Sequence, residues 1–139
     1  MKVAINCSFF IPDGGGIKQY IYNLVTNLYL VDKETEYILY VYDDKIEYAK
    51  SHFPNTWKIK STGFLSGHPI RRSLFEDFFW KKEEQLEGFD IYHSPFFHSP
   101  RLRKAKIVLT VHDLRFQRYP QTYSLLRYLF LKYKVRMSI

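Results

Sequence analysis

Two histidines and a glycine triplet are the residues of this chain best suited to chemistry. Gly14-Gly15-Gly16 opens a stretch with helical spacing, and His93-Ser94-Pro95 and His112-Asp113 each follow a short apolar run. An imidazole changes its charge near neutral pH, which suits it to hydrogen-bond a sugar hydroxyl, a phosphate or a reacting oxygen. Backbone N–H groups at a glycine-rich helix start can receive an anion, because no Cβ blocks its approach. The pattern indicates a site for a polar or phosphorylated ligand.

The glycine triplet does not match the two common nucleotide-binding patterns. Gln19 stands where Gly-x-Gly-x-x-Gly requires its third glycine, and Lys18-Gln19 lacks the Lys-Ser/Thr ending of a Walker A loop. A standard nucleotide-binding turn is therefore disfavoured. The alternative is a connection that needs glycine only for its backbone angles.

The histidines also have a structural alternative, because a lone histidine at a strand end is more often structural than catalytic. Two of them with an acid at one rim favour a shared site. A zinc site from His93, His98, His112 and Asp113 lacks the tight paired spacing of such sites. Ser94 is disfavoured as a nucleophile, because no Gly-x-Ser-x-Gly elbow surrounds it.

Strand and helix patterns alternate along the chain and would position these residues. We expect strands at 2–6, 37–42, 57–60, 89–92 and 107–111, and helices over 17–28, 69–87 and 122–137. Alternation of this kind predicts right-handed βαβ units and an α/β fold with a doubly wound, mainly parallel, Rossmann-like sheet. The ligand crevice of such a sheet lies beyond the carboxyl ends of its strands. We therefore expect the glycine loop and both histidines at one rim.

The two later helices have predicted faces. In the 69–87 helix we expect Ile70, Leu74, Phe75 and Phe78 to point inward and residues 81–84 to point outward. The last helix has a broad apolar arc and carries Lys132 and Arg136 on one face; the arc comprises Tyr123, Leu126, Leu129, Phe130, Tyr133 and Met137. Two alternatives stay open, an interfacial membrane helix and a core helix covered by something outside this chain.

Charge and composition narrow the class of protein. The 139 residues carry a net charge of +7, and residues 101–139 hold ten Lys or Arg against the single acid Asp113. Such a surface attracts nucleic acid, an anionic membrane or phosphorylated small molecules. Because Cys7 is the single cysteine, the chain can form no internal disulfide. The sequence has no apolar run long enough to span a membrane and no signal-peptide core, so we expect the protein to be cytoplasmic.

Several stretches, in order, resemble the N-terminal domain of the retaining glycosyltransferases called group 1 or family 4, which have the two-domain GT-B fold. They are Met1-Lys2-Val3-Ala4-Ile5, Gly14-Gly15-Gly16-Ile17 with Tyr20, Arg72 with Glu76, Asp90-Ile91-Tyr92-His93-Ser94-Pro95, and Val108-Leu109-Thr110-Val111-His112-Asp113-Leu114. Each is weak alone, and the ordered set is fairly specific.

The resemblance implies roles for single residues. Gly15 and Gly16 would lie beside the donor diphosphate, and His112, with Asp113 next to it, would contact the transferred sugar. His93, Ser94 and Lys18 would line the acceptor side of the cleft. The implied reaction moves a sugar from a nucleotide diphosphate sugar to a hydroxyl acceptor, lipid-linked among the options, with retention of configuration and generally without a metal or other cofactor. Polysaccharide or glycolipid synthesis at the cell surface is the typical setting.

The chain departs from the family pattern at two places. Asn6-Cys7-Ser8 and Lys18-Gln19 replace an Asp-Ala-Arg and a Gly-Arg pair of many relatives. We also expect residues 1–139 to be the acceptor-side domain without its C-terminal donor-binding domain, truncated before its last strand and inactive alone. An uncovered sheet edge and helix face would then favour self-association.

Two other functions stay open. A stand-alone anion- or nucleotide-binding α/β module would use the glycine loop and the basic surface without catalysis. Nucleic-acid binding has the charge in its favour but no recognised motif, so no specific nucleic acid is expected. An anionic membrane surface is a further expected partner, which would make the chain peripheral on the inner face of the membrane.

Overall fold

The computed structural model describes residues 1–67 and 69–138, without the side chains of residues 69–74 and 137. Its strands are β1 (Lys2–Asn6), β2 (Glu36–Val41), β3 (Lys58–Ser61), β4 (Ile91–Ser94) and β5 (Lys106–Leu109). Its helices are α1 (Gly15–Val31), α2 (Ile46–Lys50), α3 (Pro69–Glu87), α4 (Arg115–Arg118) and α5 (Leu125–Ser138), with 3-10 turns η1 (Asp43–Lys45) and η2 (Pro120–Thr122).

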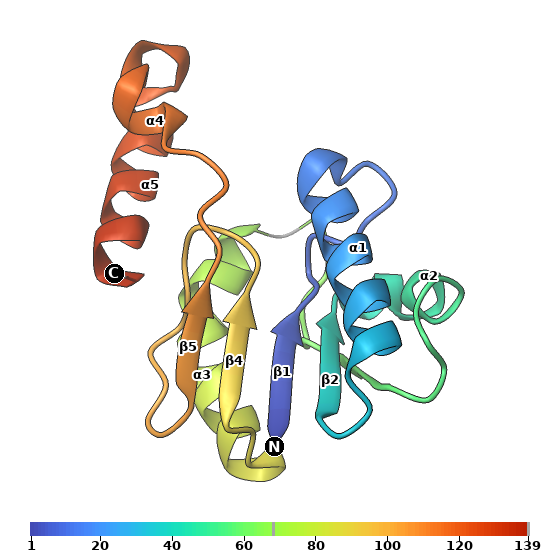
Figure 1. Ribbon diagram of the computed structural model, residues 1–139. Helices are drawn as coiled ribbons and strands as arrows, with labels where there is room; N and C mark the ends of the chain where they lie inside the picture. Colours follow the sequence, from blue (N-terminus) through green and yellow to red (C-terminus); the bar gives the residue numbers. More distant parts are fainter. Residues whose placement is uncertain (68, 139) are drawn as a thin grey trace.

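The strands form one parallel sheet in the order β3-β2-β1-β4-β5. The chain builds outward from β1 to β3, crosses back through α3, and then extends the other edge with β4 and β5 (Figure 1). This confirms the predicted α/β class and the doubly wound, Rossmann-like sheet. The order reverses between β1 and β4, which is where such sheets bind ligands.

The sheet is covered on both faces, by α1 on one and α3 on the other (Figure 1). Under α1, Ile5, Leu39 and Val25 are fully buried in one apolar cluster. Under α3, Trp80 packs against Tyr40 and Tyr92, with ring centroids 4.7 and 4.5 Å away. Because side chains of a strand alternate between faces, β2 supplies both cores, and this explains its continuous apolar run.

The predicted faces of α3 are confirmed at exposed Lys82 but wrong at four other residues. Phe75 and Phe78 are 55% and 73% exposed, whereas Glu83 and Glu84, expected to point outward, are buried beside Trp80. The error has a physical reason: these carboxylates find hydrogen-bond donors inside the fold, so burial does not leave them unpaired. The side chains of Ile70 and Leu74 lie outside the described residues.

The partners of Glu83 and Glu87 form a network between α3 and the β2–β3 edge. Lys60 Nζ lies 2.5 Å from Glu83 Oε2 and 2.8 Å from Glu87 Oε1. The Tyr40 hydroxyl donates to Glu83 at 2.9 Å, and Lys58 Nζ lies 2.8 Å from Glu87. The network fixes the C-terminal half of α3 to the sheet.

The predicted helix over 122–137 is divided. Pro120 begins the turn η2, and the long helix starts at Leu125. Its buried residues are Leu131 and Val135, which pack on Phe116 of α4. The described members of the predicted apolar arc other than Tyr123 are exposed, so the arc does not face the core; Met137 lies outside the described side chains.

The first prediction concerns acid stability. Hydrogen bonds from Lys58 and Lys60 lower the pKa of Glu87 to about 2. A carboxylate that holds its proton less tightly in the folded state stabilises the fold above its ordinary pKa and loses that contribution as the pH falls from about 5 to about 2. Glu87→Gln should lower the melting temperature at pH 7 by about 3 to 6 °C and flatten its decline in acid.

Thermal unfolding followed by circular dichroism from neutral to acid pH measures this effect. Glu47→Gln is the matched control, because Glu47 pairs only with exposed Lys50 among the residues described, and such surface pairs contribute little. If the melting temperatures of the parent chain and of Glu87→Gln fell in parallel as the pH is lowered, the contribution of the Glu87 carboxylate to stability would be contradicted.

Candidate functional site

Thr110 lies at the centre of a polar cluster at the carboxyl ends of the strands. Its Oγ1 is 2.9 Å from His93 Nε2 and 3.2 Å from the Tyr20 hydroxyl. Tyr20 comes from α1, His93 from β4, and Thr110 directly follows β5. Side chains 90 residues apart thus meet beside the point where the strand order reverses.

His112 joins this cluster through Tyr20. The two rings meet edge to face, with centroids 4.8 Å apart, and His112 Nε2 lies 2.8 Å from the Pro95 carbonyl oxygen. Because a carbonyl only accepts, Nε2 carries a hydrogen, and in the neutral ring Nδ1 is the acceptor. His112 is exposed, so a ligand can reach it.

The structure therefore brings His93 and His112 into one cluster, with Tyr20 and Thr110 between them. Sequence reasoning missed Tyr20 and Thr110 as site residues. Thr110 could have been found from its place between β5 and His112. Tyr20 is among the residues that carry the family resemblance, but no role was assigned to it.

His93 is the less accessible of the two histidines. It is half-buried, and desolvation lowers its pKa below the ordinary 6.5. Its ring is therefore predominantly neutral at pH 7 and able both to donate and to accept a hydrogen bond. The two histidines of the cluster consequently offer different chemistry, one shielded and neutral, the other open to solvent.

The glycine loop leads directly into α1 near the same cluster. A Cβ on Gly14 would lie 2.4 Å from the Phe9 carbonyl oxygen, and Gly15 has φ +57°. Gly14 is thus required by close packing, and Gly15 by its left-handed backbone. Gly16 has open space around its Cα. The exposed first turn of α1 points N–H groups and a positive helix end toward this rim.

Three other predicted residues have local partners. Asp113 Oδ1 accepts the backbone N–H of Arg115 at 2.9 Å, where α4 begins. The Ser94 hydroxyl is fully buried, 2.6 Å from the His98 carbonyl oxygen. Lys18 Nζ donates to the Pro12 carbonyl at 2.9 Å and lies over the Tyr48 ring. Asp113 is adjacent to the cluster, whereas Ser94 and Lys18 are not brought into it.

His98 is also directed elsewhere. Its Nε2 lies 3.1 Å from Glu76 Oε1, which Lys134 Nζ also contacts at 2.6 Å. Within residues 1–67 and 69–138, no group of three or more His, Cys, Asp or Glu could hold a metal ion. The Arg72 side chain, paired with Glu76 in the family pattern, lies outside the described residues.

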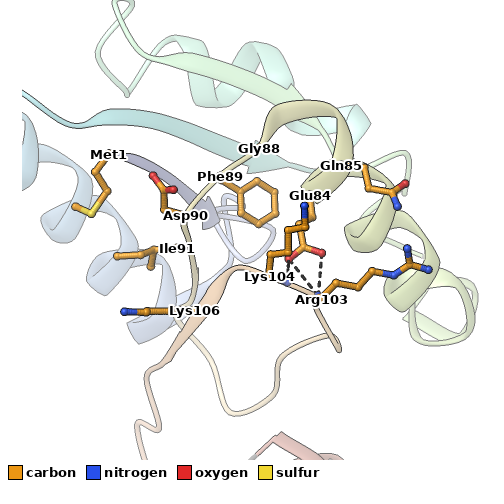
Figure 2. Close-up of a pocket in the computed structure, with 10 residues that line it drawn as sticks. All are labelled: Met1, Glu84, Gln85, Gly88, Phe89, Asp90, Ile91, Arg103, Lys104 and Lys106. Carbon is orange, nitrogen blue, oxygen red and sulfur yellow. Dashed lines mark hydrogen bonds between the residues drawn. The ribbon is translucent and has the colours of Figure 1, made fainter.

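A cavity of about 840 Å³ lies at the opposite end of the sheet, where the strands begin. Figure 2 shows the Glu84 carboxylate turned toward the backbone of Arg103 and Lys104 there. Glu84 accepts the N–H groups of Arg103, Lys104 and Ala105 at 2.9, 2.8 and 2.7 Å. The amides that could receive an anion are occupied by this carboxylate, so the carboxyl-end cluster is the better candidate site.

Comparisons with protein-family models, curated proteins and solved structures find no match for this chain. The fold defines its class as a Rossmann-like α/β protein with a polar cluster at its switch point. Among the described residues, no helix is long and apolar enough to cross a membrane.

The glycines give a direct test of the loop geometry. Gly14→Ala should cost about 2 kcal/mol of unfolding free energy or more, because the new methyl group meets a backbone oxygen and the Lys18 Cβ. Gly16→Ala is the matched control and should not destabilise, because its site is open and alanine favours a helix. Urea unfolding measures both, and equal losses would contradict the close packing at Gly14.

A second test concerns the cause of the low pKa of His93. Thr110→Val removes the hydroxyl that contacts His93 but keeps the shape of the side chain. Because burial lowers the pKa of His93, that pKa should stay below 6.5 in the variant. NMR of the His93 ring protons against pH measures it. A return to the ordinary value would assign the shift to the lost hydroxyl contact instead.

Proposed function

We propose that this chain is the acceptor-side domain of a retaining glycosyltransferase. The reaction breaks the bond between the anomeric carbon and the β-phosphate oxygen of a nucleotide diphosphate sugar. The anomeric carbon then bonds to an acceptor hydroxyl, whose proton is released, and the nucleotide diphosphate departs. Under this proposal a second domain provides most of the donor contacts.

The observation that supports this proposal is the cluster of Tyr20, Thr110, His93 and His112 beside the glycine loop. A glycosyl donor has a polar sugar joined to a doubly charged diphosphate, so its site needs hydrogen-bonding groups next to a region of positive potential. The imidazoles and hydroxyls suit the sugar. The first turn of α1 suits the diphosphate, through its N–H groups and helix dipole.

Each group has a role in the proposed step. Gly15 and Gly16 place no side chain at the start of α1, so a phosphate can approach the backbone closely there. Fixed N–H donors would stabilise the charge that grows on the leaving diphosphate. His112 is the exposed imidazole and would contact the transferred sugar, whereas shielded His93 would hold Thr110 and Tyr20 in position behind it.

The proposal includes the setting of the reaction. The acceptor is a hydroxyl compound of cell-surface polysaccharide or glycolipid synthesis, lipid-linked in the simplest case. The protein would then work in the cytoplasm, at the inner face of the membrane. Of the ten basic residues of 101–139, Arg103, Lys104 and Lys106 line the cavity at the opposite end of the sheet, and Lys134 pairs with Glu76. The exposed basic residues of α4 and α5 suit an anionic lipid surface.

NMR titration of the ¹⁵N-labelled chain with uridine and guanosine diphosphate sugars tests the donor side of this proposal. The largest amide shifts are expected at Gly15, Gly16 and His112. His112→Ala should weaken binding of the preferred donor about three- to tenfold, the effect of one lost hydrogen bond. His52→Ala is the control and should leave the affinity unchanged, because His52 is an exposed histidine just after α2 whose Nδ1 contacts the Tyr48 carbonyl oxygen.

Two outcomes would contradict the proposal. Equal binding of inorganic pyrophosphate and nucleotide sugars, unaffected by His112→Ala, would indicate an anion-binding module without sugar recognition. Shifts confined to residues 103–106 would move the site to the opposite edge of the sheet. The reading frame beyond codon 139 is an independent check, since the proposal expects it to encode a second α/β domain with paired glutamates.

A further inference from the structure

One side of α5 is held firmly against the rest of the protein. Leu131 and Val135 pack on Phe116, and Lys134 Nζ reaches Glu76 of α3 at 2.6 Å. The Ser138 hydroxyl oxygen accepts the backbone N–H of Ser99 at 3.0 Å. These contacts decide which face of the helix points outward.

The outward face consists mainly of apolar side chains. At 100° per residue, its large side chains lie on the side of the helix opposite Leu131 and Val135. Their exposed fractions are far above those of core residues: Leu125 71%, Leu126 82%, Leu129 50%, Phe130 44% and Tyr133 62%. We call these five residues the α5 stripe. A contiguous apolar surface of this kind marks an interaction site.

Basic residues lie along one border of the α5 stripe. At 100° per residue, exposed Arg136 lies beside Leu125 and Leu129, with exposed Lys132 next to them. Arg127 lies on the same side of the helix as Leu131. Arg127 also lines, with Arg115, a cavity of about 310 Å³ beside the start of α5. Between residues 114 and 138 the sequence contains no acidic residue. The partner of this surface must therefore offer an apolar interior and negative charge together.

The positive charge beside the α5 stripe distinguishes between its possible partners. A second copy that paired through its own α5 stripe would bring the two sets of Lys132 and Arg136 together. The exposed strand β5 of a second copy would present Lys106. Like charges oppose both arrangements. A bilayer with anionic phospholipids satisfies both requirements, because its headgroups are negative and its acyl region accepts leucine and aromatic side chains.

We propose that α5 is a membrane-docking helix that lies in the plane of an anionic phospholipid bilayer, with the α5 stripe at the acyl boundary and Lys132 and Arg136 at the headgroups. Tyr133 suits the interface, since its ring is apolar and its hydroxyl polar. This inference names the surface for the membrane setting proposed above and rests on that proposal for its biological context. In Figure 1, α4 and α5 lie beyond the carboxyl end of β5, on the side away from α1, so docking there need not cover the glycine loop.

Co-sedimentation with vesicles tests this inference and needs no sugar donor, so its outcome is separate from that of the nucleotide-sugar titration. The chain should bind vesicles of phosphatidylcholine mixed with phosphatidylglycerol, bind pure phosphatidylcholine more weakly, and lose affinity as salt is raised. Leu126→Ser/Leu129→Ser should weaken binding about tenfold or more, because less apolar surface enters the bilayer. Lys132→Gln/Arg136→Gln should also weaken it about tenfold or more, since each basic residue near the surface contributes about fivefold.

The control is Leu86→Ser/Lys82→Gln on α3, which makes one substitution of each kind at another exposed helix surface and should leave binding unchanged. The substituted side chains are exposed, and unchanged melting curves will verify that each variant folds. Failure of the parent chain to bind anionic vesicles, or equal binding by the α5 variants, would overturn the inference. If the parent chain did not bind lipid but formed dimers, and Leu126→Ser/Leu129→Ser abolished those dimers, the α5 stripe would instead bind a second copy of the chain.

Discussion

The fold depends on a row of carboxylates that α3 directs into the protein. Glu84 accepts three backbone N–H groups of residues 103–105, Glu83 accepts from Tyr40 and pairs with Lys60, and Glu76 meets His98 and Lys134. A carboxylate out of water is costly unless donors replace its hydration, and here each one has donors from a different segment of the chain. These directional contacts fix α3 to β2, β3, the β4–β5 connection and α5 at once. Apolar packing alone, which is non-directional, would not specify these positions so closely.

The contacts of these carboxylates also determine the geometry of the candidate site. The β4–β5 connection has no helix of its own among the described residues, so Glu84 at one end and the Glu76–His98 contact at the other hold it in place. That connection sets the register of β5 against β4, in which Val108 pairs with His93, and thus brings Thr110, two residues further on, within 2.9 Å of the His93 ring. The buried Ser94 hydroxyl supports the same turn from within. The family resemblance implied that Ser94 lines the acceptor side of the cleft, whereas its hydroxyl is fully buried and contacts the His98 carbonyl oxygen.

Features that depend on local spacing could be read from the sequence, and features that depend on distant partners could not. The alternation of strand and helix patterns along the chain predicted the parallel sheet, and the ligand-crevice rule for such sheets placed the glycine loop and both histidines at its carboxyl rim. The face of α3 was misread because its buried side depends on donors up to 58 residues away, as in the contact between Glu76 and Lys134. Tyr20 was missed for the same reason, since Thr110 lies 90 residues from it. The functional roles of Gly15, Gly16, His93, His112 and Asp113 stay predictions.

The same reasoning explains why α5 shows an apolar face to solvent. Its sequence is apolar around much of its circumference, so a choice between faces by hydrophobicity alone is weak. The contact of Lys134 with Glu76 decides it, because only one rotation of the helix brings that ammonium to the buried carboxylate. Turning the α5 stripe inward would separate the pair and leave Glu76 with His98 as its remaining described partner, while Lys132 and Arg136 would move toward the protein. A buried ion pair thus sets the orientation of α5, and the exposed leucines follow from that orientation and do not indicate poor packing.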